Sequence, residues 1–188
     1  SAGELLKSDD NGASWQTIND FESAVLKIII SPRDNHEIYV ATAKKAIFTS
    51  FDRGVTWLNS LDALKQFKGA TGYKDLIYDE TREGVLLYAS NYGLLWTEDG
   101  GSNWRQLALL TPPGSVNILA IGLNPNNPSQ IYYATADVLY RSFDGGVNWL
   151  TSSLPSKRGA SELIIDWQNE NNVYMSVRRV KEKRSGLF

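Results

Sequence analysis

The chain has 188 residues, no cysteine and a formal net charge of −2, from 19 basic and 21 acidic residues. The lack of cysteine excludes disulfides and thiolate metal sites, and the small acidic excess argues against a surface that binds nucleic acid throughout. The apolar runs, such as residues 25–31, are too short to span a membrane, and the first ten residues lack the basic and apolar segments of a signal peptide.

From residue 25 onward the chain predicts short strands in groups of four. Segments 25–31, 37–43 and 46–51 are rich in β-branched and aromatic residues, and a fourth segment follows at 55–60. We call the four strands of such a unit a, b, c and d. Clusters of Pro, Asn, Asp and Gly separate strand a from strand b. Residues 61–72 are compatible with either a short helix or a loop.

One pattern, Ser/Thr-x-Asp-x-Gly-x-Ser/Thr/Asn-Trp, occurs four times, beginning at Ser8, Ser50, Thr97 and Ser142. The copies are roughly 45 residues apart, which is the length that one four-stranded propeller blade consumes. Each copy falls between a strand c and a strand d. The pattern therefore predicts a repeat protein built from blades.

The residue types of this pattern suit a tight turn. Glycine tolerates a positive φ, the aspartate accepts hydrogen bonds from amides of the turn, and the tryptophan buries a large apolar surface. We therefore expect structural roles for the residues at these three positions, which are Asp10, Gly12, Trp15, Asp52, Gly54, Trp57, Asp99, Gly101, Trp104, Asp144, Gly146 and Trp149.

The four segments resemble Asp-box (BNR) repeats, and residues 123–135 resemble the same group of proteins. The group contains sortilin-like receptors, photosystem II stability and assembly factors, sialidases and xyloglucan-cleaving glycosidases. The resemblance implies an all-β propeller of four-stranded antiparallel blades. It also implies that the boxes lie on outer c–d turns, away from the ligand-binding face, and that the protein is secreted, periplasmic or part of the cell envelope.

We expect a single propeller domain over residues 1–188, equivalent to about four blades. Its predicted parts are a c–d pair at 1–18, blades at 24–60, 73–109 and 116–153, and a, b and c strands at 161–188. The two ends are complementary parts of one blade. Three arrangements remain open. The chain could form a small ring with a shared blade, or a homodimer that covers the open strand edges. The third arrangement, which we favour, is that the chain is part of a larger propeller.

No catalytic constellation is complete. The Arg-Ile-Pro motif of sialidases is absent, but an inverting glycosidase needs only two carboxyl groups across a cleft. Asp75 and Glu162 begin a strands of two different blades and could face one another across a channel. The alternative is that they are solvated or pair with Lys74 and Arg158. We expect no catalytic residue, and Asp75 and Glu162 are the candidates if the protein is an enzyme.

Other reactive or ligand-binding side chains are few. His36 is the single histidine and lies in a polar turn, so we expect no metal site, no histidine-activated serine and no cofactor. Tyr73, Tyr92 and Trp167 could stack on sugar rings, but aromatic residues at strand ends commonly pack within blades.

The d–a and b–c loops are predicted to lie together at one end of the propeller and to be rich in cations. This basic face predicts a non-catalytic binding or assembly scaffold that docks an anionic partner, either an acidic protein segment or an acidic glycan. The alternative is a fragment of a glycoside hydrolase or a carbohydrate-binding propeller. The expected contacts are Lys44, Lys45, Lys157, Arg158, Arg178, Arg179, Lys181 and Lys183.

Overall fold

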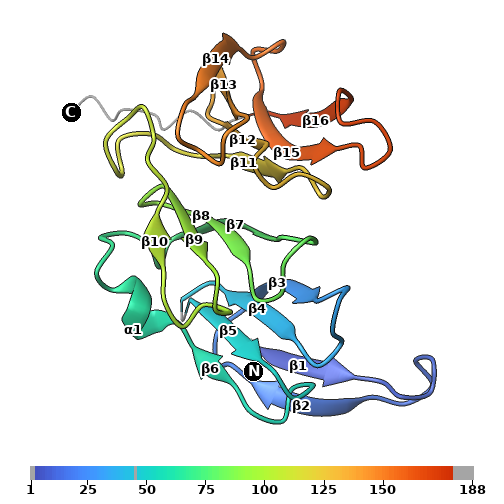
Figure 1. Cartoon of the computed structure of the whole chain (residues 1–188). Coiled ribbons are helices and arrows are strands. Elements are labelled where there is room, and N and C mark those ends of the chain that lie inside the picture. The colour runs from blue at the N-terminus through green and yellow to red at the C-terminus, as the bar shows by residue number, and fades with distance from the viewer. Residues whose placement is uncertain (1–2, 45, 180–188) are drawn as a thin grey trace.

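The structure is a computed structural model that describes residues 3–44 and 46–179. It consists of antiparallel sheets with a single short helix among these residues. Figure 1 shows the sheets following one another through the molecule in the order of the chain. The predicted all-β class and the blade architecture are confirmed.

Three of the sheets have four strands each and correspond to complete blades, and two are hairpins. The N-terminal hairpin pairs β1 (Glu4–Lys7) with β2 (Gln16–Asp20). Blade 1 contains β3 (Val25–Ile30), β4 (Ile38–Thr42), β5 (Ile47–Ser50) and β6 (Leu58–Asn59). Blade 2 contains β7 (Tyr73–Tyr78), β8 (Leu86–Ser90), β9 (Leu94–Thr97) and β10 (Arg105–Gln106). Blade 3 contains β11 (Ala120–Leu123), β12 (Ile131–Ala134), β13 (Val138–Ser142) and β14 (Leu150–Ser153). The C-terminal hairpin pairs β15 (Gly159–Ile165) with β16 (Val173–Arg178), and the c strand expected after it lies outside the described residues.

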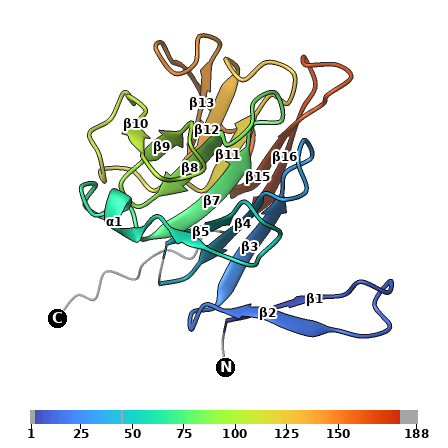
Figure 2. The same ribbon diagram turned by 60° about the horizontal axis from the view of Figure 1, so that its bottom comes forward.

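Within each blade the strands pair in chain order, so strand a is the innermost and strand d the outermost. Figure 2 shows the a strands β3, β7, β11 and β15 gathered on the inner side of the arc. The segment at 61–72, left open by the sequence, forms one helical turn, α1 (Leu61–Leu64), followed by turns. Leu64 on this turn is fully buried and anchors the connection between blades 1 and 2.

The hydrophobic core lies between the blades. Every residue of β4, β8 and β12 is buried, because each of these b strands has a neighbouring sheet on both faces. The cluster between blades 1 and 2 contains Tyr39 and Leu76, and the cluster between blades 2 and 3 contains Leu87 and Ile121.

The box tryptophans differ in burial according to what precedes them. Trp149 is 9% exposed, stacks edge-on against Tyr133 at 4.9 Å, and donates its indole N–H to the carbonyl of Ala108 in the preceding blade at 2.8 Å. Trp57 donates to the carbonyl of Gly54 within its own box at 3.1 Å. Trp15 departs from the expected burial and is 63% exposed, because no described strand covers the N-terminal hairpin on that side.

We predict that Trp149→Ala destabilises the chain by ~3 to 5 kcal/mol, since a buried indole is replaced by a cavity between two blades. The measurement is urea unfolding followed by circular dichroism. Trp167→Ala is the matched control because Trp167 is 66% exposed, and it should change stability by less than ~0.5 kcal/mol. Equal losses for the two variants would contradict the proposed fastening of blade 3 to blade 2.

Candidate functional site

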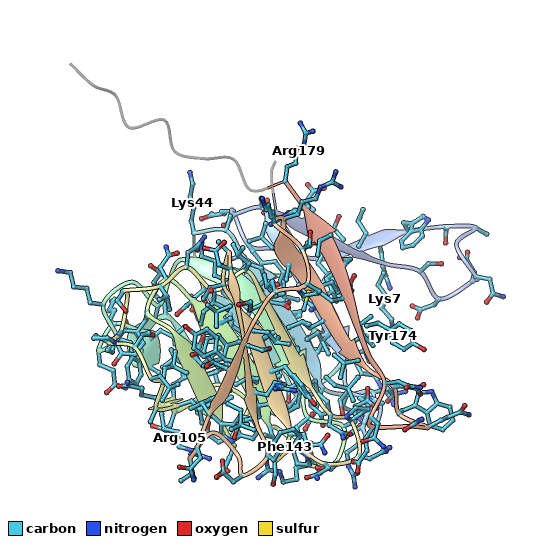
Figure 3. All side chains as sticks on the ribbon, turned by 90° about the horizontal axis from the view of Figure 1, so that it is seen from above. Lys7, Lys44, Arg105, Phe143, Tyr174 and Arg179 are labelled. Atoms are coloured by element: carbon cyan, nitrogen blue, oxygen red, sulfur yellow. The ribbon has the colours of Figure 1, made fainter. Side chains whose placement is uncertain are left out.

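The loops lie in two groups at opposite ends of the blades, and backbone hydrogen bonds show which loops lie together. The amide of Arg53 in a box donates to the carbonyl of His36 in an a–b turn at 3.0 Å. At the other end, the amide of Leu154 after strand d donates to the carbonyl of Asp137 in a b–c loop at 2.9 Å. We call the end with boxes and a–b turns the box face, and the end with b–c and d–a loops the loop face. Figure 3 shows Lys44 of the loop face on the side opposite Phe143 of the fourth box.

On the box face, each box aspartate is enclosed by donors of its own turn. The carboxylate of Asp52 accepts hydrogen bonds from the Ser50 hydroxyl at 2.7 Å, the Thr56 amide at 2.8 Å and the Thr56 hydroxyl at 2.6 Å. Asp10, Asp99 and Asp144 accept equivalent bonds in the other boxes. The two residues after each box aspartate have positive φ values, such as 62° at Arg53 and 90° at Gly54.

These hydrogen bonds stabilise the ionised carboxylates. Side-chain and backbone bonds from Thr56 lower the pKa of Asp52 to about 2, and bonds from Ser14 do the same for Asp10. Bonds from Asn148 lower the pKa of Asp144 to about 2. For Asp99, burial acts in the opposite direction, but the bonds from Asn103 outweigh it and the pKa is lowered. The lone pairs of all four box aspartates are therefore largely committed within the turns.

The loop face carries the predicted cations that the structure describes. Lys44 lies between β4 and β5, Lys157 and Arg158 lie before β15, and Arg178 and Arg179 lie at the end of β16. All five side chains are exposed. Lys45, Lys181 and Lys183 lie outside the described residues.

No salt bridge within the described part of the chain involves any of these five cations. Figure 3 shows Lys44 and Arg179 projecting from the same side of the molecule although they come from blades at opposite ends of the arc. The structure thus places cations from distant parts of the sequence at the same end of the blades, where their side chains are exposed.

The a strands line a groove of about 350 Å³ on the inner side of the arc. Asp75 and Glu162 both line it, as the sequence suggested, together with Lys27. Lys27 Nζ lies 2.8 Å from Asp75 Oδ1, and the two side chains are 37% and 25% exposed. The partner of Asp75 is therefore Lys27 rather than Lys74 or Arg158.

Sequence reasoning missed Lys27, although the strand register contains the signal. Lys27 pairs with Ala41, and Asp75 pairs with Ala89, so the two hold the same position on neighbouring a strands. An alignment of the blades by register, instead of by box, would have placed them together.

Some of the remaining candidate side chains pack against other aromatic rings, and others are exposed. The ring centroids of Tyr73 and Tyr88 are 6.2 Å apart, and those of Tyr92 and Phe67 are 5.2 Å apart. Tyr73 therefore packs within blade 2, and Tyr92 packs on the connection between blades 1 and 2. Trp167 is exposed and lines the groove beside Glu162. His36 is bound to Asp34, with 2.6 Å between Nδ1 and Oδ1, on the box face.

The family model of Sortilin-Vps10, described as sortilin, neurotensin receptor 3, matches residues 3–108. Xyloglucanase Xgh74A of Acetivibrio thermocellus is 27% identical over 158 residues, which covers 78% of this chain and 16% of the xyloglucanase. A probable oligoxyloglucan-reducing end-specific xyloglucanase of Neosartorya fischeri is 26% identical over 83 residues, covering 43% of this chain and 10% of that protein. The chain thus spans only a small part of the length of these relatives.

Solved structures share the fold at low sequence identity. The GH74 enzyme of Niastella koreensis has a TM-score of 0.72 and 17% identity, covering 94% of this chain and 30% of that one. YCF48 from Cyanidioschyzon merolae has a TM-score of 0.64 and 18% identity, covering 93% of this chain and 58% of that one. A further structure, YCF48 bound to D1 peptide, has a TM-score of 0.59 and 12% identity, covering 94% of this chain and 54% of that one. The predicted resemblance to sortilin-like, assembly-factor and xyloglucanase propellers is confirmed. The part of the chain that the structure describes contains no candidate membrane-spanning helix.

We predict that acid removes the contribution of the box carboxylates to stability. Since the pKa of Asp52 falls from 3.8 to about 2 on folding, its contribution is complete above pH ~4 and is lost as the pH falls towards ~2. Asp52→Asn should therefore be less stable than the wild type at neutral pH, and the difference should shrink over this range. The measurement is urea unfolding at several pH values. Ser153→Ala, an exposed change outside the boxes that removes no carboxyl group, is the control and should give no such narrowing.

Proposed function

The chain belongs to the Sortilin-Vps10 family, and on that premise we propose that it is a non-catalytic binding module whose loop face docks an acidic segment of a protein partner. The observation that carries this proposal is the set of five exposed cations on the loop face without a salt-bridge partner among the described residues. By contrast, the box aspartates are saturated by their own turns and have little capacity left for a ligand.

The contrast between the charge of the loop face and that of the whole chain supports this proposal. The whole chain has a net charge of −2, so a face rich in unpaired cations differs from the average surface. Loops from several blades end at this face, and their potentials add where they converge. Such a field accelerates the encounter with an acidic partner and orients it.

Structures with the same fold are described in complexes with peptides or proteins. They include YCF48 bound to D1 peptide and a nidogen and laminin complex. These neighbours support a binding role for the fold, and the charge of the loop face supplies the chemistry of the partner. We place the protein in a secreted, periplasmic or cell-envelope location on the basis of the resemblance to its family.

Reversing two charges of the loop face should weaken this binding. We predict that Arg178→Glu with Arg179→Glu lowers the affinity for a labelled decaglutamate peptide about tenfold, equivalent to ~1.4 kcal/mol, measured by fluorescence anisotropy. The wild-type affinity should fall as salt is raised, because exposed charges are screened over ~8 Å at physiological ionic strength. Stability should change by less than ~0.5 kcal/mol, since both residues are exposed.

The matched control is Arg33→Glu with Arg53→Glu, which makes the same change of charge on the box face. Both of these side chains are exposed. Equal weakening by the two double variants would show a response to net charge alone and would refute the loop face as the site. If the chain bound heparin but not the peptide, the partner would be an acidic glycan instead of an acidic protein segment.

A second candidate function is action on a polysaccharide. The specific observation is that Asp75, Glu162 and the exposed Trp167 line one groove. Most glycosidases use two carboxyl groups that flank the scissile bond, and an exposed indole ring can stack on a sugar. One observation argues against this candidate. Asp75 forms an ion pair with Lys27, so of the two carboxylates only that of Glu162 has no salt bridge among the described residues.

Hydrolysis of xyloglucan separates the two functions. We expect no release of reducing sugar above background by the chain, and no difference between the wild type and the variants Asp75→Asn and Glu162→Gln. The released sugar is measured by a reducing-end assay and by chromatography of the products. Turnover that both variants abolish would instead establish the groove as a catalytic site.

A further inference from the structure

Strand β14 (Leu150–Ser153) is the outermost strand of blade 3, and all four of its residues are exposed. One of its edges pairs with β13, and no other strand of the described residues pairs with it. Figure 1 shows β14 at the margin of the molecule. Because its second edge points away from the inner side of the arc, the exposure of that edge does not depend on the blades to either side.

The pairing of β14 with β13 determines where its backbone groups point. In an antiparallel pair, hydrogen-bonded and non-hydrogen-bonded residue pairs alternate. The amide of Leu154 donates to the carbonyl of Asp137 on the β13 side at 2.9 Å, so Ser152, two residues earlier, also bonds to β13. The amides and carbonyls of Thr151 and Ser153 therefore point away from β13. We call these groups the free edge of β14.

The other outermost strands lack a comparable edge. Natural sheets protect their edges with very short strands, charged side chains or bulges. In β6 and β10, which have two residues each, the hydrogen-bonded neighbours leave only Asn59 and Gln106 pointing outward. β2 pairs through a bulge and ends with Asp20. Since β14 has a regular register and neither charge nor proline, it is the outermost strand best suited to accept a further strand.

Two cations of the loop face lie beside one end of this edge. β14 runs from the box face to the loop face, and the exposed Lys157 and Arg158 follow it in the chain. Lys157 is four residues beyond Ser153, so the two lie at most ~14 Å apart. Asp137 lies in the b–c loop, on the inner side of β14. A strand added at the free edge would therefore bring its loop-face end close to two cations.

We propose that an extended segment of a protein partner adds to the free edge of β14 as a fifth, antiparallel strand of blade 3. Its backbone groups bond to those of Thr151 and Ser153, and acidic residues that precede the added strand contact Lys157 and Arg158. The antiparallel direction is that of the other strand pairs of this blade. The inference rests on the proposed function and deepens it, because it gives the acidic partner a backbone conformation as well as a charge.

A second copy of this chain fits the free edge less well. If β14 paired with itself in the antiparallel direction, the box before β14 of one copy would lie near Lys157 and Arg158 of the other. The carboxylate of that box, Asp144, already accepts hydrogen bonds from the amide and the side chain of Asn148. The charge of the neighbouring cations thus favours a partner with free acidic residues.

A labelled peptide of sequence Glu-Glu-Glu-Thr-Val-Thr-Val tests the proposal, because its first part matches the cations and its second part favours an extended strand. We expect saturable binding by fluorescence anisotropy. Thr151→Pro should lower the affinity about tenfold, since proline lacks the outward-pointing amide and is tolerated at a sheet edge. Thr151→Ala keeps the amide and should bind like the wild type. No saturable binding by the wild type up to about 1 mM would overturn the proposal.

The decaglutamate peptide separates this inference from the proposed function, because it binds through charge. Thr151→Pro should not change the affinity for decaglutamate, whereas Lys157→Glu with Arg158→Glu should weaken the binding of both peptides. Equal binding of the strand-forming peptide by the wild type and by Thr151→Pro would overturn strand addition and leave the proposed function intact. If the wild type failed to bind decaglutamate but Thr151→Pro still lost the strand-forming peptide, the proposed function would fail and strand addition would be supported.

Hydrogen exchange followed by nuclear magnetic resonance observes the contact in the wild-type chain, so it does not depend on the folding of a proline variant. Saturating strand-forming peptide should slow exchange of the amides of Thr151 and Ser153 about tenfold. The amide of Ser152 already bonds to β13 and should change little, and the outward amides of Asn59 and Gln106 are the internal control. Unchanged exchange at Thr151 and Ser153, equal slowing at the control amides, or a wild-type dimer that Thr151→Pro abolishes would overturn the proposal.

Discussion

A b strand such as β8, in which all five residues are buried, is stable only when apolar sheets cover both of its faces. This requirement governs the rest of the structure. It explains why the core lies between blades instead of within them, and why no blade of this chain is a self-sufficient unit. It also explains the contrast between Leu76, which a neighbouring blade covers, and Ile28, which holds the same position at the end of the arc.

The charged groups of the box face and of the loop face differ in how far they are satisfied within the chain. Each aspartate satisfies the donors of its own turn, and Trp149 also reaches the carbonyl of Ala108 in the preceding blade. These bonds stabilise the outer edge of the blades at the box face, whereas at the loop face the buried Leu64 anchors the connection between blades 1 and 2. Lys44 and Arg179 are exposed there and have no salt-bridge partner among the described residues.

The sequence predicted the fold in detail because its information repeats. Four boxes with strand patterns between them determine the number of strands, their order and the turn on which each aspartate lies. The candidate site was less predictable. The cations of the loop face follow from loop assignment alone, but the Lys27 and Asp75 ion pair depends on the register between blades. The exposure of Trp15 was missed because a motif specifies the residue and not the neighbour that covers it.

The hydrogen bonds that a box aspartate or serine accepts within its own turn join residues no more than four positions apart, as between Ser50 and Gly54 or between Asp52 and Thr56. A box can therefore form before any contact between blades, at a low entropic cost of loop closure. Strand pairs around it form next, because adjacent strands are also close in sequence. Folding can thus nucleate at any of the boxes and spread to neighbouring blades, as in a linear array of coupled units. The order of events in such a chain is set by the strength of each coupling between blades, and not by direction from one terminus to the other.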